Sequence, residues 1–295
     1  MELRVLRYFL TVVREKNITG AAKALNVTQP TLSKQLMELE ESLGKKLFVR
    51  GNRTITLTEE GMLLYRRAQE IIDLADKTES EFRGSDEVIS GDICIGGAET
   101  DAMRLTAKTI KKLQNEYPHI QYHLFSGNAD DVTERLDKGL LDFGILIEPA
   151  DIKKYDYLRL PATDTWGLLM KKDSPLAALE MIRPENLRNI PLLCSKQTLV
   201  KNEISGWLRD DYDKLNIVAT YNLIYNASLM VEEGVGYALC LDKLVNTTGS
   251  SSLCFRPLEP GLEANLDIVW KKYQVFSKAA EKFLEKLQEE INAVS

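Results

Sequence analysis

The sequence predicts an N-terminal all-α winged helix-turn-helix domain, a long linking helix, and a larger α/β body of two lobes. Length is the first observation behind this fold class, because 295 residues exceed one typical domain and suit two or three. The second is that apolar residues near the N-terminus follow helical spacing, and the third is that strand and helix patterns alternate in the body. We expect residues 1–58 to form the head, 59–90 the linking helix and hinge, and 91–295 the body.

The composition is that of an ordinary soluble globular protein, with 44% hydrophobic and 28% charged residues. A chain of this length can bury a large core, so it needs no metal or disulfide to hold it together. None of the four cysteines falls in a C-x-x-C pair, which favours buried thiols in a reducing cytosol. We see no apolar run long enough for a signal peptide or a membrane span. We therefore expect a cytoplasmic protein with no membrane partner and no cofactor.

The charge is divided unevenly along the chain. Residues 1–67 hold twelve Lys and Arg against seven Glu, a net charge of +5. Because the whole chain has a net charge of −6, the remaining residues have a net charge of −11. A basic head on an acidic body is typical of a DNA-binding domain fused to a part with a different task. Chance asymmetry of a solvated surface would give the same numbers, so the charge needs support from motifs.

Three helices are expected before residue 45. The first carries an apolar stripe at helical spacing. Thr19 is a suitable N-cap for a short second helix, and Thr28 for a third, in which Pro30 falls in the first turn, where its missing N–H costs nothing. Leucines at steps of four, three and four continue the third helix until Gly44 ends it. Two such helices around a turn of about three residues form a helix-turn-helix, whose second helix enters the major groove of DNA.

The start of the third helix carries short polar side chains suited to reading base edges. Gln can bond adenine with both ends of its amide, and Ser can bond several bases. A merely solvated helix face would be richer in Glu and Lys, and here Glu38, Glu40 and Glu41 come only later. A hairpin with a glycine turn follows over residues 45–57, with basic residues at its tip that can reach phosphates or the minor groove. The expected DNA-binding residues are Thr28, Gln29, Pro30, Thr31, Ser33, Lys34, Arg50 and Arg53.

The long helix after Thr58 carries a narrow apolar seam with a heptad repeat, and its outer positions are charged. A lone helix with such a seam needs a partner. Packing on the protein's own body is one solution, but dimerisation fits better, because it also supplies two heads for two DNA half-sites. Gly84-Ser85-Asp86 then breaks the helix. The expected dimer residues are Leu64, Ala68, Ile71, Ala75 and Phe82.

The body shows one α/β pattern that restarts after a polar segment around residues 151–164. We expect lobe I at about 91–162 and 266–295, and lobe II at about 163–265. Two lobes joined by crossing strands would leave a cleft between them, and we expect the crossings at Ile147–Asp151 and near Leu266. The strands expected in lobe II are Trp166–Met170, Leu192–Cys194, Ile217–Tyr221 and Tyr237–Leu241.

The order of residues in the head resembles that of LysR-type transcriptional regulators. The matching stretch is dense and is followed by Leu57-Thr58-x-x-Gly61; it reads Ala21-Ala22-x-x-Leu25-x-Val27-Thr28-Gln29-Pro30-x-Leu32-Ser33-x-Gln35-Leu36-x-x-Leu39-Glu40-x-x-Leu43-Gly44-x-x-Leu47-Phe48-x-Arg50. Lys34 stands where the family usually has arginine. Lysine keeps the positive charge but cannot form the two parallel hydrogen bonds of a guanidinium group. Weaker matches in the body are Tyr117-Pro118, Leu140-x-Asp142-Phe143-Gly144-Ile145, Ser174-Pro175-Leu176-Ala177 and Gly234-x-Gly236-Tyr237.

The resemblance implies a sequence-specific transcriptional regulator controlled by a small-molecule effector. It implies that the body has the fold of periplasmic substrate-binding proteins and binds its effector between the lobes. It further implies that the linking helix pairs in a homodimer, and it suggests that dimers assemble into tetramers. Operator DNA, a second copy of the chain and an unidentified effector are the expected partners, with RNA polymerase as a further candidate.

In open α/β sheets ligands lie beyond the carboxyl ends of the strands. This rule nominates polar residues after four expected strands, although Ser, Thr and Asn also favour such turns as ordinary capping residues. A carboxylate at Glu99 would favour a cationic, amino or hydroxyl-bearing effector, or would require Lys196 to offset it. The expected effector-binding residues are Glu99, Thr100, Ser126, Asn128, Ser195, Lys196 and Tyr225.

Other classes of protein fit the sequence less well. We see no G-x-S-x-G elbow, P-loop or H-E-x-x-H motif, which argues against an enzyme. A transport binding protein would share the body but not the basic head. A thiol sensor would use Cys194 or Cys240, neither of which has a resolving partner close in sequence. His119 and His123 share a strand face, but without a third ligand nearby we expect no metal site.

Overall fold

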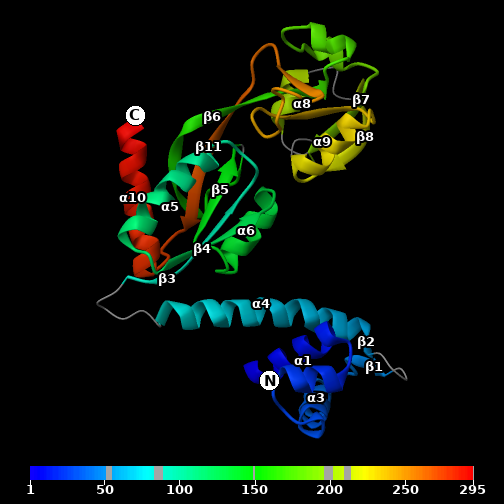
Figure 1. The fold of residues 1–295 in the computed structure, drawn as a ribbon, viewed down its shortest axis with the longest axis vertical. Helices are drawn as coiled ribbons and strands as arrows, with labels where there is room; N and C mark the ends of the chain where they lie inside the picture. The colour runs from blue at the N-terminus through cyan, green and yellow to red at the C-terminus, as the bar shows by residue number, and fades with distance from the viewer. Residues whose placement is uncertain (51–54, 83–88, 149, 196–201, 209–213, 295) are drawn as a thin grey trace. The chain divides into compact units, whose positions relative to one another are not determined.

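The computed structural model describes residues 1–50, 55–82, 89–148, 150–195, 202–208 and 214–294 (Figure 1). The chain divides into two compact units, Met1–Phe82 and Arg83–Ser295, each with its own hydrophobic core.

The first unit contains the expected helix-turn-helix. Helices α1 (Leu3–Glu15), α2 (Ile18–Ala24) and α3 (Gln29–Leu43) bury one face each, with Phe9, Leu32 and Val12 fully inaccessible. Thr28 caps α3 by accepting from the Thr31 amide at 3.3 Å, and Gly44 ends it in the left-handed region at φ 64°, as the sequence predicts.

The expected cap of α2 is wrong by two residues. Asn17, not Thr19, precedes the helix, and its Oδ1 accepts from the backbone amide of Gly20 at 2.5 Å. Asn and Thr are both good N-caps, so local sequence alone does not separate the two positions.

A short hairpin follows α3 and is fixed to it by a buried carboxylate. Strands β1 (Phe48–Arg50) and β2 (Ile55–Leu57) pair antiparallel. Glu40, only 6% exposed, accepts hydrogen bonds from the amides of Leu47 at 2.8 Å and Phe48 at 3.3 Å and from Nζ of Lys46 at 2.9 Å. Burial opposes the charge, but these three donors outweigh it and hold the pKa of Glu40 below its ordinary value.

Thr58 precedes helix α4 (Glu59–Phe82) and caps it, because its Oγ1 accepts from the Gly61 amide at 2.9 Å. Its first half packs on the helix-turn-helix, where Ala68 is fully buried and Ile72 is 7% exposed. Arg7 of α1 also forms an ion pair with Asp76 of α4. Part of the apolar seam is therefore satisfied within the same chain. Ala68, one of the residues expected at the dimer interface, is buried in the core of its own unit.

Lobe I of the second unit is a twisted sheet with helices on both faces (Figure 1). Strands β3 (Gly91–Gly97), β4 (Ile120–Ser126) and β5 (Phe143–Ile147) run parallel. Helices α5 (Met103–Glu116) and α10 (Lys278–Val294) share one hydrophobic core with the sheet. Helix α6 (Ala129–Asp137) belongs to a second core with residues of β5 and β11 (Glu263–Lys271).

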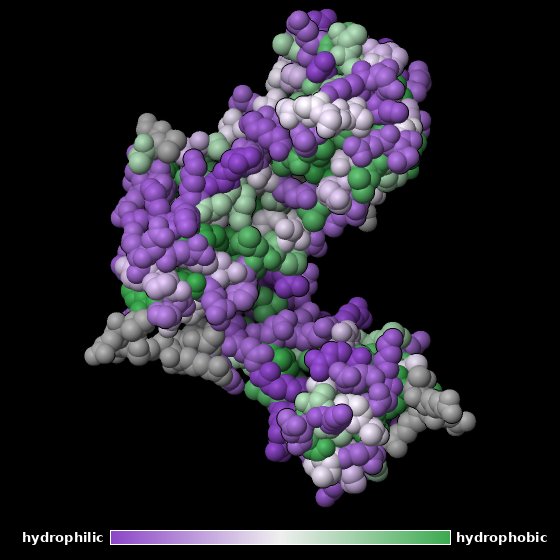
Figure 2. Space-filling view, viewed as in Figure 1, coloured by the Kyte–Doolittle hydropathy of each residue, from purple (hydrophilic) through white to green (hydrophobic). Residues whose placement is uncertain are grey.

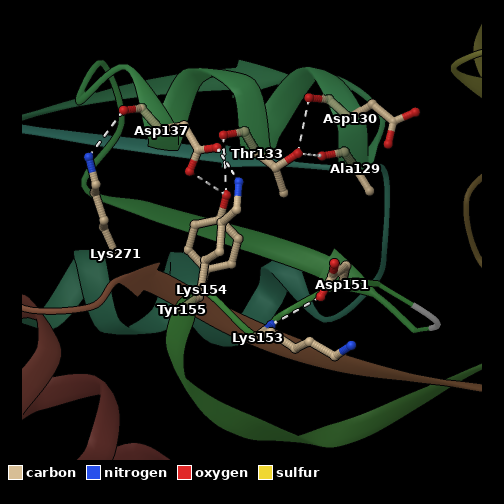
Figure 3. A network of polar contacts seen from close by, with 9 residues as sticks. All are labelled: Ala129, Asp130, Thr133, Asp137, Asp151, Lys153, Lys154, Tyr155 and Lys271. Atoms are coloured by element: carbon tan, nitrogen blue, oxygen red, sulfur yellow. Dashed lines mark hydrogen bonds and ion pairs between the residues drawn. The ribbon is translucent and has the colours of Figure 1, made fainter.

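Polar contacts fix the C-terminal end of α6 to the neighbouring strands (Figure 3). The hydroxyl of Tyr155, a residue that is 4% exposed, donates to Oδ1 of Asp137 at 2.8 Å. Lys154 pairs with the same carboxylate at 3.3 Å, and Nζ of Lys271 donates to the Asp137 carbonyl at 3.2 Å. Burial and the adjacent carboxylate raise the pKa of Tyr155 far above its usual range, so it remains a hydrogen-bond donor. Two lysines at the negative end of α6 also complement the helix dipole.

Lobe II is a second α/β layer built on the continuation of the same sheet. Strands β7 (Pro191–Ser195), β8 (Asn216–Tyr221) and β9 (Tyr237–Leu241) run parallel, and β10 (Leu253–Pro257) pairs with β6 (Tyr155–Lys171). Short 3-10 turns lie at Pro175–Ala178 and Pro184–Leu187, and helices α8 (Asn202–Leu208) and α9 (Ile224–Glu232) complete the described part of the lobe.

The lobes are joined by β6 and β11. β6 pairs with β11 from Tyr155 to Thr165 and then with β9 and β10 from Trp166 onward. The expected return strand near Leu266 is confirmed as β11. The expected crossing at Ile147–Asp151 is wrong, because β5 ends at Ile147 and the crossing strand begins only at Tyr155. Its first part is rich in charged residues and contains Pro161, so its sequence resembles a polar connection.

Replacing Glu40 with Gln is expected to lower the free energy of unfolding of the first unit by about 1–3 kcal/mol at neutral pH. The cause is loss of the charged acceptor for Lys46 and the two amides. Because the folded-state pKa of Glu40 lies below the ordinary 4.5, this stabilisation is present above that value and is lost as the pH falls through the folded pKa. Denaturant titration at several pH values measures it.

Glu38→Gln is the matched control, because Glu38 lies on the exposed face of the same helix. It is expected to change stability by less than about 0.5 kcal/mol. Equal losses for both variants at neutral pH would contradict the anchoring role of Glu40.

Candidate functional site

The start of α3 presents a polar surface. Thr28, Gln29, Thr31 and Lys34 are exposed and Ser33 is half-buried, whereas the leucines on the opposite side are buried. Nε2 of Gln29 donates to Oγ of Ser33 at 3.0 Å, and the hydroxyls of Thr28 and Thr31 lie 2.7 Å apart. These short side chains hold one another in place at the positive end of the helix dipole. Pro30, exposed in the first turn, adds an apolar edge.

The hairpin of β1 and β2 continues from this helix. Its register pairs Arg50 with Ile55, so the tip begins after Arg50. Arg53 and the rest of the tip lie outside the described residues, as does the side chain of Arg50. The expected contacts of these two arginines therefore have no described geometry.

Helix α4 carries a stripe of exposed apolar side chains beside its buried face. Leu63 is 53%, Ile71 36% and Leu74 43% exposed. Leu64 packs against the core of its own unit, and Ala75 is half-buried. The side chain of Phe82 lies outside the described residues. Among the described residues of the expected seam, Ile71 is the most exposed, and Leu63 and Leu74 are not among the residues expected to pair.

A cavity of about 340 Å³ lies between the lobes, at the carboxyl ends of β3 and β4. Its lobe I wall contains Glu99, Thr100, Asp101 and Ser126, and its lobe II wall contains Lys243 with Leu244. Figure 2 shows hydrophobic surface in the middle of lobe I, over its sheet, whereas the surface over α10 is mainly hydrophilic. The cavity is large enough for a small metabolite rather than for a peptide.

Two cavity residues already form contacts between chain segments far apart in sequence. Oγ1 of Thr100 donates to Asp164 of β6, which is 1% exposed, and accepts from the Ala102 amide at 3.1 Å. Burial raises the pKa of Asp164, although the hydrogen bond from Thr100 opposes this. Oε2 of Glu99 accepts from the backbone amide of Ile224 at 2.6 Å.

The other residues expected to bind the effector do not line this cavity in the described part of the chain. Asn128 caps α6, accepting from the amides of Asp130 and Asp131, so its polar group is used structurally. Ser195 ends β7 and Tyr225 is 69% exposed, and neither is among the residues that line this cavity. Lys196 lies outside the described residues.

Sequence reasoning missed Asp101 and Lys243 as cavity residues. Lys243 follows the carboxyl end of β9, and its Nζ lies 3.1 Å from Asp242. The rule that nominated Glu99 and Ser126, polar residues after a strand, could have found it. Asp101 pairs with Arg104 at 2.7 Å on the next helical turn.

Cys194 and Cys240 have the features of inert core residues. Cys194 and Cys240 are buried in cores on opposite sides of the lobe II sheet, so they cannot resolve one another's oxidation. Burial raises the pKa of each thiol to about 12. Reactive thiols need an accessible thiolate, so this geometry argues against the thiol sensor.

Within the described residues, no three His, Cys, Asp or Glu side chains gather as a metal site would require. Nε2 of His123 lies 3.2 Å from Asp92. The helices of the described part include none that is long and apolar enough to span a membrane.

Comparisons with known proteins identify both units. Residues 3–62 match the family model of the bacterial regulatory helix-turn-helix proteins of the lysR family, and residues 86–292 match the LysR substrate binding domain. The HTH-type transcriptional regulator BudR of Klebsiella aerogenes is 39% identical over 143 residues, covering 48% of this chain and 100% of that sequence. The Hca operon transcriptional activator HcaR of Escherichia coli is 26% identical over 301 residues, covering 100% of both chains.

Solved structures share the fold along the whole chain. The full-length regulator CbnR in complex with its target DNA has a TM-score of 0.75 at 18% identity, with 100% of both chains covered. HinK of Pseudomonas aeruginosa has a TM-score of 0.55 at 23% identity, with 98% of both chains covered. The helix-turn-helix, the two-lobed α/β body and the family models agree, and the chain is a member of the LysR family of transcriptional regulators, not an enzyme.

Proposed function

We propose that the exposed face of α3 reads operator DNA through Gln29, Pro30 and Ser33, with Thr28, Thr31 and Lys34 beside them. The observation that carries this proposal is the cluster of short polar side chains at the start of α3, set on a buried leucine stripe and held by the Gln29–Ser33 hydrogen bond. Gln and Ser are suited to base edges, and Lys34, Arg50 and Arg53 are suited to phosphates or the minor groove.

The proposed binding site of the effector is the cavity between the lobes. Glu99, Thr100 and Ser126 line it, and its two walls come from different lobes, so a ligand there touches both. A ligand acts on a two-state protein only through its different affinity for the two states. A site between two lobes supplies that difference, because its contacts depend on how far the lobes are closed.

The proposed active form is a homodimer that carries two heads. Two such dimers are proposed to pair into a tetramer. The exposed stripe of Leu63, Ile71 and Leu74 supports pairing through α4. In the second unit, the edge strands β4 and β8 expose Leu124 at 61% and Val218 at 47%, which is a further apolar surface for self-association. RNA polymerase is a candidate partner by virtue of the regulatory role, and the cytoplasm is the proposed location because operator DNA is there.

Ser33→Ala is expected to cost roughly 1–3 kcal/mol of binding free energy on the operator and little on random duplex DNA. The operator is first obtained by selection from a pool of random duplexes. Fluorescence anisotropy at fixed salt then gives both affinities, since salt changes every phosphate contact.

Ser42→Ala is the matched control for this variant. Ser42 lies near the other end of α3, with its Oγ bonded to the Leu39 carbonyl at 2.9 Å. It is expected to leave both affinities within about twofold. Equal losses on operator and random DNA for Ser33→Ala would exclude a base-reading role.

Ile71→Glu is expected to lower the mass of the assembly measured by light scattering, because it places a charge in the proposed α4 interface. Gln69→Glu adds the same charge on another exposed face of the helix and is expected to keep the mass of the unaltered chain. A folded Ile71→Glu protein of unchanged mass would show that this stripe does not hold the assembly together.

A fragment of residues 91–295 is expected to fold alone and to have no operator affinity. It contains all the buried residues of the lobe I core and lacks only Ile89 among the residues packed against them, whereas every proposed DNA contact lies before residue 54. Thermal melting followed by circular dichroism tests its folding, and the anisotropy assay tests its DNA binding. Operator binding as tight as that of the full chain would show that the head is not the DNA-binding part.

A further inference from the structure

A carboxylate of lobe I supplies the N-cap of a helix in lobe II. Glu99 follows β3 in lobe I, and Ile224 is the first residue of α9 in lobe II. The hydrogen bond from the Ile224 amide to Oε2 of Glu99, at 2.6 Å, joins residues 125 positions apart. It is therefore a contact made only when the two lobes lie close together.

Helix α9 needs such an acceptor from outside. Its own N-cap position is Leu223, which has extended backbone angles and forms no side-chain cap. A leucine offers no acceptor, so the first amides of α9 must find one elsewhere. The N-terminus of a helix also favours a negative charge. Glu99 provides both the acceptor and the charge, and it occupies the place where an anionic ligand would otherwise bind.

The remaining charges at the cavity are already paired. Asp101 pairs with Arg104 at 2.7 Å, and Lys243 pairs with Asp242 at 3.1 Å. Among the described residues Glu99 has no cationic partner, and its only described hydrogen bond uses Oε2. Oε1 of Glu99, a residue that lines the cavity, is the acceptor that remains.

Resting on the proposed effector function of this cavity, we propose that Glu99 is its specificity-determining residue. Its carboxylate fills the anion position at the start of α9, so the cavity takes a small ligand with a protonated amine and excludes small carboxylates. The ammonium group bonds Oε1 while Oε2 stays on the Ile224 amide. Ligand binding then strengthens a contact that joins the lobes, because one carboxylate is shared between the ligand and α9.

The test uses the full chain and pairs of probes with matched skeletons and opposite charge: putrescine against succinate, and ethanolamine against glycolate. Thermal shift detects saturable binding, and calorimetry gives the Kd, with ionic strength held constant by sodium chloride. Glu99→Gln keeps an acceptor for the Ile224 amide but removes the charge. Glu99→Ser removes the carboxylate from the N-terminus of α9. Glu180→Gln, an exposed carboxylate elsewhere in lobe II, is the charge-matched control.

The unaltered chain and the Glu180→Gln control are expected to bind at least one amine and neither carboxylate. Glu99→Gln is expected to weaken amine binding by about tenfold or more, since a hydrogen bond to a charged group is lost. Glu99→Ser is expected to gain saturable binding of succinate or glycolate at the vacated N-terminus of α9.

Three results would overturn the proposal: carboxylate binding by the unaltered chain, amine binding unchanged by Glu99→Gln, or no saturable response to either amine. If Glu99→Ser fails to fold, Glu99→Gln alone decides. Operator affinity measured on the same samples separates this inference from the proposed function. Loss of operator affinity in the unaltered chain would contradict the proposed function. Intact operator binding, together with the same ligand preference in the unaltered chain and in Glu99→Gln, would contradict only the role of Glu99.

Discussion

The antiparallel pairing of β6 and β11 is the constraint on which the body depends. β6 pairs with strands of both lobes, and β11 pairs with both β6 and β5, so the two strands fix how the two parallel half-sheets face each other. The carboxyl ends of β3 and β4 come to the same side as the residues that follow β9, and the cavity forms there. Arg159 of β6 strengthens the pair, with Nε 2.7 Å from the buried Asp267 of β11 and a bidentate contact to Glu148. Few other contacts are then needed to join the lobes, and those observed can serve ligand binding.

The head was largely predictable from sequence because its signals are local. Thr28, Gly44 and Thr58 cap or end helices through bonds to residues within a few positions, and such patterns are visible in the sequence itself. The error at Thr19 is of the same local kind, since two suitable caps lie two positions apart. The role of Glu40 was not predictable, because its partners Leu47 and Phe48 lie at the start of a hairpin whose place beside α3 is set by tertiary packing.

The body was predictable in its order of elements and less so in its connections. The apolar strands β5, β7 and β9 are buried on both faces and are easy to recognise. β6 is harder to recognise, because its first part has few buried residues at irregular spacing and includes Pro161. Within the candidate site, the rule of polar residues after parallel strands found Glu99 and Ser126, yet it could not foresee that Glu99 bonds α9. That contact depends on the separation of the lobes, which no local pattern encodes.

The attachment of the wing to α3 has a consequence for the DNA rather than for the protein. Because Glu40 bonds the amides of Leu47 and Phe48, where β1 begins, the base of the hairpin cannot swing freely relative to the third helix. In the proposed complex with DNA, the offset between α3 in the major groove and the hairpin beside it is therefore set before binding. A duplex whose groove width does not match this offset must bend or twist to fit, and the energy of that deformation depends on base sequence. Base pairs that no side chain touches can therefore contribute to the choice of operator.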